Sequence, residues 1–585
     1  MKDAVGKISS LHVGRETVDS VLLSTRQVPA GKGEKSMSMH PRDFSTVPEQ
    51  TARVAQAAFP KGNPYMLLRD ELGVLYEDSA FSTLFESTRG RPAESPGCLA
   101  LVTALQFAEN LSDRQAADAV RGRIDWKYLL GLELTDAGFD HTLLHEFRMR
   151  LLESNAQRQL LDSLLGQLKA RKLLRVGSQQ RTDSTHVLAA IRDLNRLENV
   201  GETLRHALES LATVVPDWLR ARVPAEWFER YGKRFEQWRL PKSLAEQQTL
   251  AETIGQDGYR LWEMTGESPA VLWLREIPAI ASLHQVWQQQ YDWQGELARW
   301  RKSDELPPTG VLISSPHDVE AHFSIKRSTE WTGYKVHLTE TCEDDLPLLV
   351  TNVETTTSTI TDVEMTQTIH EHLAEKDLLP RQHLVDAGYV DARILVESQP
   401  ALGIDVVGPA PADHSWQART EHAYHLACFE IDWDTQQVTC PQGRVSADWR
   451  SSLDRHKELT IHVRFRKRDC LDCSARVQCT CARTNPRTLT FRPKDQHLAL
   501  QHARQRQKSA EFKETYARRA GIEGTISQGT RVCGLRRSRY IGLAKTHLQH
   551  VFTAVAINLM RLAHWFAQSP RAHTRCPRFA ALAPA

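Results

Sequence analysis

The sequence predicts a mixed α/β protein: a sheet flanked by helices, with an all-α domain before it, an all-α insertion and a small β-rich insertion of zinc type. Apolar residues recur at helical spacing across residues 48–174. The content of β-branched residues rises at 175–191, and strand-like runs return after residue 306. Four of the ten cysteines lie between Cys470 and Cys481, a spacing typical of a metal site.

Length and composition exclude several classes of protein. A chain of 585 residues is too long for a single core, and 41% hydrophobic with 25% charged residues is an ordinary globular composition. Ten cysteines are too few for a disulfide scaffold in a chain of this length. The first 40 residues lack the apolar core of a secretory signal, and no apolar run reaches the length of a membrane span. The sequence therefore predicts a cytoplasmic protein without a membrane partner.

We expect six parts along the chain. They are a disordered tail (1–46), an N-terminal helical domain (47–174), a discontinuous α/β domain (175–191, 307–411 and 495–567), a helical insertion (192–306), a cysteine-rich β insertion (412–494) and a C-terminal tail (568–585). The tail from residue 1 shows no periodicity and is rich in Gly, Ser and Lys, so Met37 or Met39 is a candidate start of the protein.

The N-terminal domain has the signals of short helices joined by tight turns. Ser112 and Gln115 form a capping-box pattern. One interpretation is a helix-turn-helix DNA-binding domain in which Arg121, Arg123 and Lys127 face phosphates. The alternative is a helical bundle that only supports the next domain.

Two aspartates lie on predicted strands of the α/β domain. Asp183 lies within the strand-like run at 175–191, and Asp386 follows a short buried strand at 383–385. Ligand-binding residues gather at the carboxyl ends of strands in open α/β sheets, so Asp386 is a site candidate, whereas Asp391 is expected to be a helix-turn residue. Further strands are expected at 310–315, 331–341, 346–356 and 403–410, and a helix at 360–377.

The cysteine-rich insertion has the pattern of a structural zinc site. Two hairpin-like runs at 428–443 and 459–467 surround the cysteines. Four thiolates, two of them from a Cys-x2-Cys turn, suit a tetrahedral Zn²⁺. The preferred ligands are Cys440, Cys470, Cys473 and Cys479; Cys481 or Cys428 could replace one of them, and reduced free thiols are the alternative.

The stretch 511–550 combines one acid with a basic patch. It holds eight Lys or Arg residues against three acids. On one helix, Tyr516, Arg519 and Glu523 would share a face. The plain interpretation is a surface pair of Arg519 with Glu523, and the sharper one is a carboxylate set beside a phosphate-binding arginine.

Three carboxylates that converge repel one another and therefore need divalent cations. If Asp183, Asp386 and Glu523 meet, they could hold two Mg²⁺ (or Mn²⁺) ions for an in-line phosphoryl displacement. The surrounding Arg and Lys side chains would bind DNA phosphates.

At these residues the chain resembles bacterial insertion-sequence transposases of the DDE class, which have an RNase H-like catalytic domain. Asp183 in RTDSTHV matches the first acid and Asp386 in LVDAGYVD the second. Tyr516, Arg519 and Glu523 match a Tyr-x2-Arg-x3-Glu-x6-Lys signature, in which Thr530 stands where the lysine is expected.

The resemblance implies a DNA transposase of a bacterial, nucleoid-associated kind. It would bind the terminal inverted repeats of its element, cleave DNA and join the 3′-hydroxyl ends to target DNA with two metal ions. Double-stranded DNA would be its partner, and synapsis of two ends would need a homodimer or a higher oligomer. The residues expected to contact DNA are Tyr516, Arg519, Arg531, Arg536, Arg537, Arg539 and Lys545. The alternative is a zinc-containing DNA-binding or nuclease protein derived from a transposase, without strand transfer.

Overall fold

The computed structural model describes residues 37–38, 41–85, 91–294, 297–326, 328–454 and 457–570. Most of the predicted disordered tail and of the C-terminal tail lies outside these residues, as does Met39. Met37–Ser38 (β1) pairs in parallel with Arg91–Pro92 (β2). No helix in the described part of the chain is long and apolar enough to cross a bilayer.

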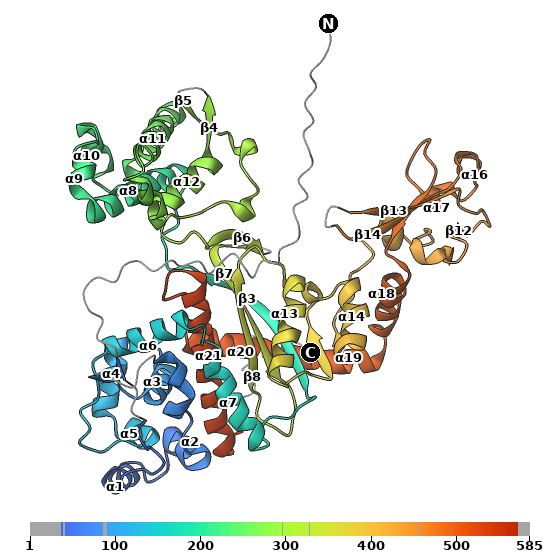
Figure 1. Ribbon diagram of the computed structural model, residues 1–585. Coiled ribbons are helices and arrows are strands. Elements are labelled where there is room, and N and C mark those ends of the chain that lie inside the picture. The colour runs from blue at the N-terminus through green and yellow to red at the C-terminus, as the bar shows by residue number, and fades with distance from the viewer. Residues whose placement is uncertain are drawn as a thin grey trace, which may run out of the picture.

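A six-stranded mixed sheet forms the centre of the molecule, which confirms the predicted α/β class (Figure 1). Its main order is β10-β9-β3-β7-β6, with β8 on the free edge of β7. β3 is parallel to β9 and antiparallel to β7, and β9 is parallel to β10. The strands are β3 (Gln179–Leu188), β6 (His322–Lys326), β7 (Thr329–Thr341), β8 (Val350–Thr357), β9 (Gln382–Val385) and β10 (Asp405–Val407).

Helices connect and cover this sheet. α13 (Asp362–Glu375) links β8 to β9, and α14 (Ala392–Leu402) links β9 to β10 after the 3-10 turn η7 (Ala387–Tyr389). α18 (Lys494–Arg506), α19 (Ala510–Ala517), the 3-10 turn η9 (Arg518–Ala520), α20 (Gly521–Val532) and α21 (Leu543–Phe566) follow the cysteine-rich insertion. α20 packs on β3 and β7, and α21 packs on β8.

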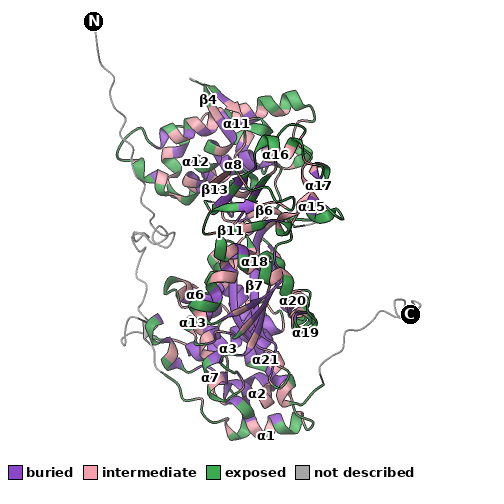
Figure 2. Cartoon of the chain, turned by 90° about the vertical axis from the view of Figure 1, so that its right-hand side faces the viewer, coloured by how far each residue is buried: buried purple, intermediate pink, exposed green. Residues whose placement is uncertain are grey.

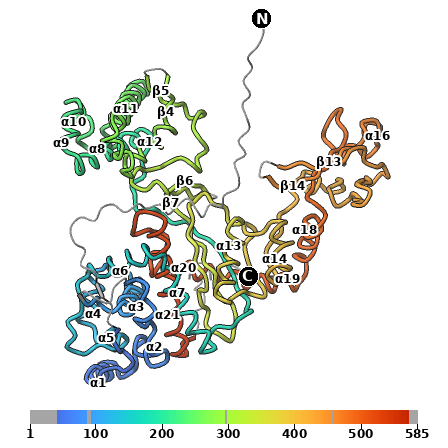
Figure 3. Tube along the Cα trace, in the orientation of Figure 1, coloured from blue at the N-terminus to red at the C-terminus, as the bar shows by residue number. Residues whose placement is uncertain are grey.

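The N-terminal helices pack around α21. They are α1 (Glu49–Ala58), α2 (Pro64–Leu72), η2 (Asp78–Leu84), α3 (Pro96–Ala108), α4 (Asp113–Gly122), α5 (Ile124–Leu130), α6 (Thr142–Glu153) and α7 (Gln159–Ala170). α2, α3 and α7 contact α21, so the two ends of the described chain lie side by side (Figure 3). One hydrophobic cluster runs from these helices through α21 into the sheet. Buried residues accordingly concentrate along α3, α21 and β7 (Figure 2).

The helical insertion has its own hydrophobic cluster. It comprises α8 (Arg196–Val214), α9 (Pro216–Arg220), α10 (Ala225–Tyr231), η3 (Gln237–Arg239), α11 (Leu244–Met264), η4 (Leu272–Glu276) and α12 (Pro278–Gln290). It ends in a hairpin of β4 (Tyr291–Gln294) and β5 (Leu297–Trp300), so the prediction of an all-α insertion is wrong in this detail. The strand predicted at 310–315 is also wrong: η5 (Ser303–Glu305) and η6 (Thr309–Val311) are 3-10 turns, and the new strand begins later, at β6.

The cysteine-rich insertion is a separate small β unit with a third cluster. It contains α15 (Trp416–Arg419), η8 (Leu426–Cys428), β11 (Glu430–Asp432), β12 (Gln437–Thr439), β13 (Asp448–Leu453), β14 (Leu459–Arg464), α16 (Lys467–Leu471), α17 (Arg476–Cys479) and β15 (Thr488–Phe491). β11 and β12 form the predicted hairpin, and β14 lies between β13 and β15. The two insertions extend away from the sheet on opposite sides of β6 (Figure 1).

Candidate active site

Asp183 projects from the middle of β3. Successive side chains of a strand alternate between its faces, so Arg181 and Asp183 share one face and Thr182 points to the other. One Asp183 oxygen accepts the Ser184 amide at 2.8 Å, and the other accepts Arg519 Nη2 at 2.6 Å. Burial raises the pKa of the Asp183 carboxyl above its ordinary value, although the Arg519 charge and the Ser184 amide oppose that shift.

Asp386 follows the last residue of β9, which lies beside β3. Thr182 of β3 and Val385 of β9 are paired in the parallel register. Asp183 and Asp386 each follow one residue of this pair directly. The Asp386 carboxylate caps η7 by accepting the Ala387 amide at 2.7 Å. The register of two parallel strands therefore brings the two aspartates close together, where β9 ends beside the middle of β3.

Glu523 reaches the same place from the opposite direction. It lies in the first turn of α20, and its side chain is 67% exposed. The predicted single helix is divided by η9, whose tighter turn comes between Tyr516 and Glu523. Tyr516 stacks on Phe512, with 5.5 Å between ring centroids.

The guanidinium of Arg519 lies among all three carboxylates. Nη2 is 2.6 Å from Asp183 and 3.9 Å from Asp386, and Nη1 is 3.4 Å from Glu523. The predicted pair of Arg519 with Glu523 does form, but the Arg519 side chain is only 13% exposed and also binds Asp183, so it is more than a surface pair. Its Nε is buried and has no hydrogen-bond partner among the described residues. One cation thus screens the mutual repulsion of the three acids.

The three acids line an open hollow of about 560 Å³. Its other lining residues include Lys326, Thr530, Arg531 and Arg536. Lys326 ends β6, 3.6 Å from Asp362 and 3.4 Å from the Ser184 hydroxyl. Lys326 was not among the predicted site residues, because a strand was expected at 310–315 and not at the run HFSIK that forms β6. Arg536 donates to the Thr185 hydroxyl at 2.8 Å.

Only some of the basic residues predicted to bind DNA lie at the hollow. Arg531 and Arg536 line the hollow, whereas Arg537 and Lys545 are exposed but are not among its described lining residues. Arg539 packs over the Phe107 ring and donates to Leu111 O and to Asn110, at the end of α3. These contacts tie α3 to the segment before α21, so Arg539 has a structural role here.

The cations predicted to face DNA from the N-terminal domain are largely used inside the protein. Lys127 is buried, and its Nζ donates to two carbonyl oxygens at 2.7 Å, which makes that prediction wrong for Lys127. Arg123 binds the carboxylates of Glu109 and Asp125. Arg121 is exposed and pairs with Asp118 at 2.8 Å. The predicted Ser112–Gln115 capping box is confirmed at the start of α4.

The four preferred cysteines meet at one small cavity of the β insertion. Cys440, Cys470, Cys473 and Cys479 all line a space of about 30 Å³. The described lining includes neither Cys428 nor Cys481, both of which are exposed. Burial raises the pKa of the Cys479 thiol to about 11, and the proximity of Cys470, Cys440 and Cys473 adds to that shift.

Both clusters have donors of the right chemistry for a metal ion. Carboxylate oxygens suit Mg²⁺, and thiolates suit Zn²⁺. In the part of the chain that the structure describes, no group of three or more His, Cys, Asp or Glu is arranged as a formed metal site. Each set is therefore gathered at one cavity without the closeness of a coordination shell.

Two family models match the chain. A transposase DDE domain matches residues 439–563, which include Glu523, and a transposase domain (DUF772) matches residues 53–150 within the N-terminal helices. Comparison with curated proteins and with solved structures gave no match. Both matched models describe transposase domains, and together they support an insertion-sequence transposase of the DDE class.

Proposed function

We propose that this transposase binds the terminal inverted repeats of its element, cleaves DNA there and joins the 3′-hydroxyl ends to target DNA. The observation that carries the proposal is the hollow in which Asp183, Asp386 and Glu523 meet Lys326, Arg519, Arg531 and Arg536. The acids are far apart in the sequence, and the cations around them suit a phosphate backbone. The strand order and the mixed pairing of the sheet support an RNase H-like fold for this domain.

Each group in the hollow has a distinct part in this reaction. Asp183, Asp386 and Glu523 would hold two Mg²⁺ or Mn²⁺ ions. These ions would activate a water molecule or a 3′-hydroxyl for attack and would stabilise the leaving oxygen. Lys326, Arg531 and Arg536 hold the phosphates on either side of the reacting bond. Arg519 leaves the acids when they take up divalent cations and then contacts the DNA backbone.

Strand transfer of an oligonucleotide that carries the element end, in Mg²⁺, tests the proposal. Asp386→Asn should lower product formation at least about a hundredfold, because the amide lacks the charge that a divalent cation requires. Asp391→Asn is the matched control: Asp391 caps α14 by accepting the Ile394 amide, and asparagine caps as well. Equal product from wild type and Asp386→Asn would refute the site.

The same assay distinguishes a nuclease from a transposase. A nuclease derived from a transposase would release cleaved ends but form no joined product. A DNA-binding protein without catalysis would retain the oligonucleotide and yield neither product. Synapsis of two ends requires at least a homodimer on DNA, which the mass of the complex measured in solution would reveal.

We further propose that Cys440, Cys470, Cys473 and Cys479 bind one structural Zn²⁺. Their shared cavity and the small hydrophobic cluster around it support this assignment. Cys473→Ser should abolish the bound zinc, whereas Cys481→Ser should leave it in place. Purified protein without zinc would refute the site.

A further inference from the structure

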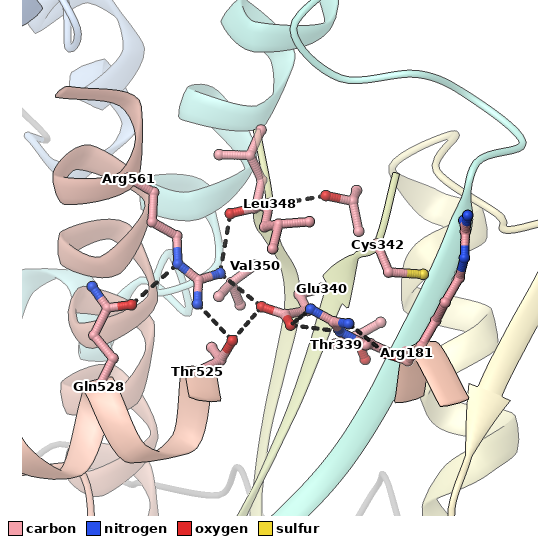
Figure 4. A network of polar contacts seen from close by, with 12 residues as sticks. Arg181, Thr339, Glu340, Cys342, Leu348, Val350, Thr525, Gln528 and Arg561 are labelled. Carbon is pink, nitrogen blue, oxygen red and sulfur yellow. Dashed lines mark hydrogen bonds and ion pairs between the residues drawn. The ribbon is translucent and has the colours of Figure 1, made fainter. Parts of the chain in front are cut away.

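Glu340 is a fully buried acid at the centre of a network of polar contacts with Arg181, Thr525 and Arg561 (Figure 4). It lies on β7 and is 0% exposed. One of its oxygens accepts Nε of Arg181 at 2.7 Å, with Nη2 of the same residue also at 2.7 Å. The other oxygen accepts Nη1 of Arg561 at 2.7 Å and the hydroxyl of Thr525.

The network joins four elements, two of which carry proposed metal ligands. Arg181 is on β3, two residues before Asp183 and on the same face of that strand. Thr525 is on α20, two residues after Glu523, and it also accepts Nη2 of Arg561 at 2.6 Å. Arg561 comes from α21 and additionally binds Gln528 of α20 (Figure 4). Glu340 therefore connects the strand of one acid with the helix of another.

Arg181 also contacts the beginning of α20 directly. Its Nη1 donates to the carbonyl oxygen of Arg518, the residue before Arg519. A Cβ atom added to Gly521 would lie 2.1 Å from that Nη1 and 2.4 Å from the guanidinium carbon. Real Cβ atoms do not approach other atoms so closely. An alanine at the first residue of α20 would therefore displace the Arg181 guanidinium from this contact.

Stability alone does not account for these charges. A buried ion pair recovers its desolvation cost only with excellent geometry, and a well-packed apolar replacement is often equally stable. The planar, forked guanidinium of an arginine binds a carboxylate through two parallel N–H groups, so it fixes the direction and distance of its partner more strictly than apolar packing does. In this network the fixed geometry is the distance between β3 and α20, which sets how closely Asp183 and Glu523 approach each other.

We propose that Arg181 and Glu340 are positioning residues that hold α20 against β3, so that Glu523 and Asp183 can share divalent cations. The inference rests on the proposed function, because it assigns the purpose of the network to that metal site. Arg181 contacts neither proposed reacting group: it acts through the carbonyl of Arg518, through the packing of Gly521 and through Glu340.

The test is the Mg²⁺ dependence of end cleavage, measured together with DNA affinity in the absence of divalent cations. Arg181→Lys keeps the charge but loses the fork, and it should raise the half-saturating Mg²⁺ concentration at least about tenfold. DNA affinity should stay within about twofold of wild type, because the network is not on the DNA surface. The matched control is Arg148→Lys, since Arg148 is 5% exposed and pairs with Asp113 among the N-terminal helices, away from the site.

Two further variants keep the proposal open to refutation if Arg181→Lys does not fold. Thr525→Val removes one hydroxyl at constant shape and should raise the Mg²⁺ requirement in the same direction. Gly521→Ala should do so as well, because the added methyl group would displace the Arg181 guanidinium.

The outcomes separate the inference from the function on which it rests. Equal Mg²⁺ requirements for wild type, Arg181→Lys and Arg148→Lys would show that the network is merely structural and would overturn the inference. Unchanged cleavage by Asp386→Asn would instead refute the proposed site itself.

Discussion

Arg519 determines the electrostatic state of the candidate site in this structure. Its guanidinium contacts Asp183, Asp386 and Glu523 together. Two like charges about 4 Å apart repel by roughly 4 kcal/mol per pair at an effective dielectric near 20. A cation that lies between the carboxylates is therefore strongly held. Divalent cations must compete with Arg519 for the same oxygens.

Replacement of Arg519 should therefore separate metal binding from catalysis. Arg519→Gln removes the competing charge, so we expect Mn²⁺ to bind the DNA-free protein at least about fivefold more tightly, as followed by electron paramagnetic resonance. DNA cleavage should fall, because the phosphate contact is lost as well. Weaker Mn²⁺ binding by Arg519→Gln would contradict the competition, and Arg531→Gln is the control for loss of a cation farther along the hollow.

Lys326 is a second residue whose role follows from the structure, because no sequence motif indicated it. Its side chain is 47% exposed and lines the hollow. Thr530, which stands where the signature expects a lysine, lines the same hollow. Lys326→Ala should weaken DNA binding about equally for all sequences and lower the slope of log K against log salt by about 0.9. Lys242→Ala, an exposed change in the helical insertion, should leave the slope unchanged. An unchanged slope for Lys326→Ala would exclude a phosphate contact.

At the scale of elements, strong patterns predicted strands well and weak ones did not. The runs that became β7, β8 and β10 are apolar or β-branched, and they pack in the sheet as predicted. The run at 310–315 is equally apolar, but it lies next to Pro307 and Pro308 and forms a 3-10 turn. The edge strand β6 was missed although Phe323 and Ile325 alternate with polar residues, because an alternating run of only five residues is a weak signal. Local pattern therefore does not determine which short apolar segment joins the sheet.

In the candidate site, too, some features could be predicted from the sequence and others could not. The positions of Asp183 and Asp386 follow from strand register and could be predicted from their motifs. The contact of Arg519 with all three acids depends on the approach of α20, which no local spacing encodes. Glu340 lies in the run LTETCED, which looks like a polar strand end, and only the tertiary structure shows that it is buried between two arginines.

The buried histidines of the sheet make its stability depend on pH. Burial, the largest cause, lowers the pKa of His337 on β7 to about 4, and its Nδ1 is 2.7 Å from the hydroxyl of Tyr389. The folded state thus favours neutral imidazole, so this stabilisation is present above the ordinary pKa near 6.5 and is lost as pH falls toward 4.

From pH 7 to pH 5, His337 alone should lower the free energy of unfolding by about 2 kcal/mol. Hydrogen exchange of the β7 amides at the two pH values, corrected for intrinsic rates, measures this loss. His337→Gln should remove about that much of the difference between the two values. A pH dependence as steep in the variant as in the wild type would contradict the assignment to His337.

At the scale of the whole molecule, α21 unites the N-terminal helices and the sheet. Asn558 on α21 hydrogen-bonds both the amide and the carbonyl of Val350 on β8, at 2.7 and 2.9 Å. Phe552 on the same helix packs against Phe107 of α3, with 5.7 Å between ring centroids. One continuous core therefore extends from α3 to β8, whereas the two insertions have cores of their own.

This arrangement predicts which parts of the chain unfold together. Phe552 is 1% exposed, so Phe552→Ala should cost about 3–5 kcal/mol and lower hydrogen-exchange protection in both α3 and β8. Phe429→Ala is the control: Phe429 is 6% exposed in the core of the cysteine-rich insertion, and its replacement should reduce protection only in that insertion. Loss of protection in α3 with β8 unaffected would mean that the N-terminal helices unfold independently. If the two regions lose protection together, any movement of the N-terminal helices on DNA is transmitted through α21 to the sheet that carries Asp183.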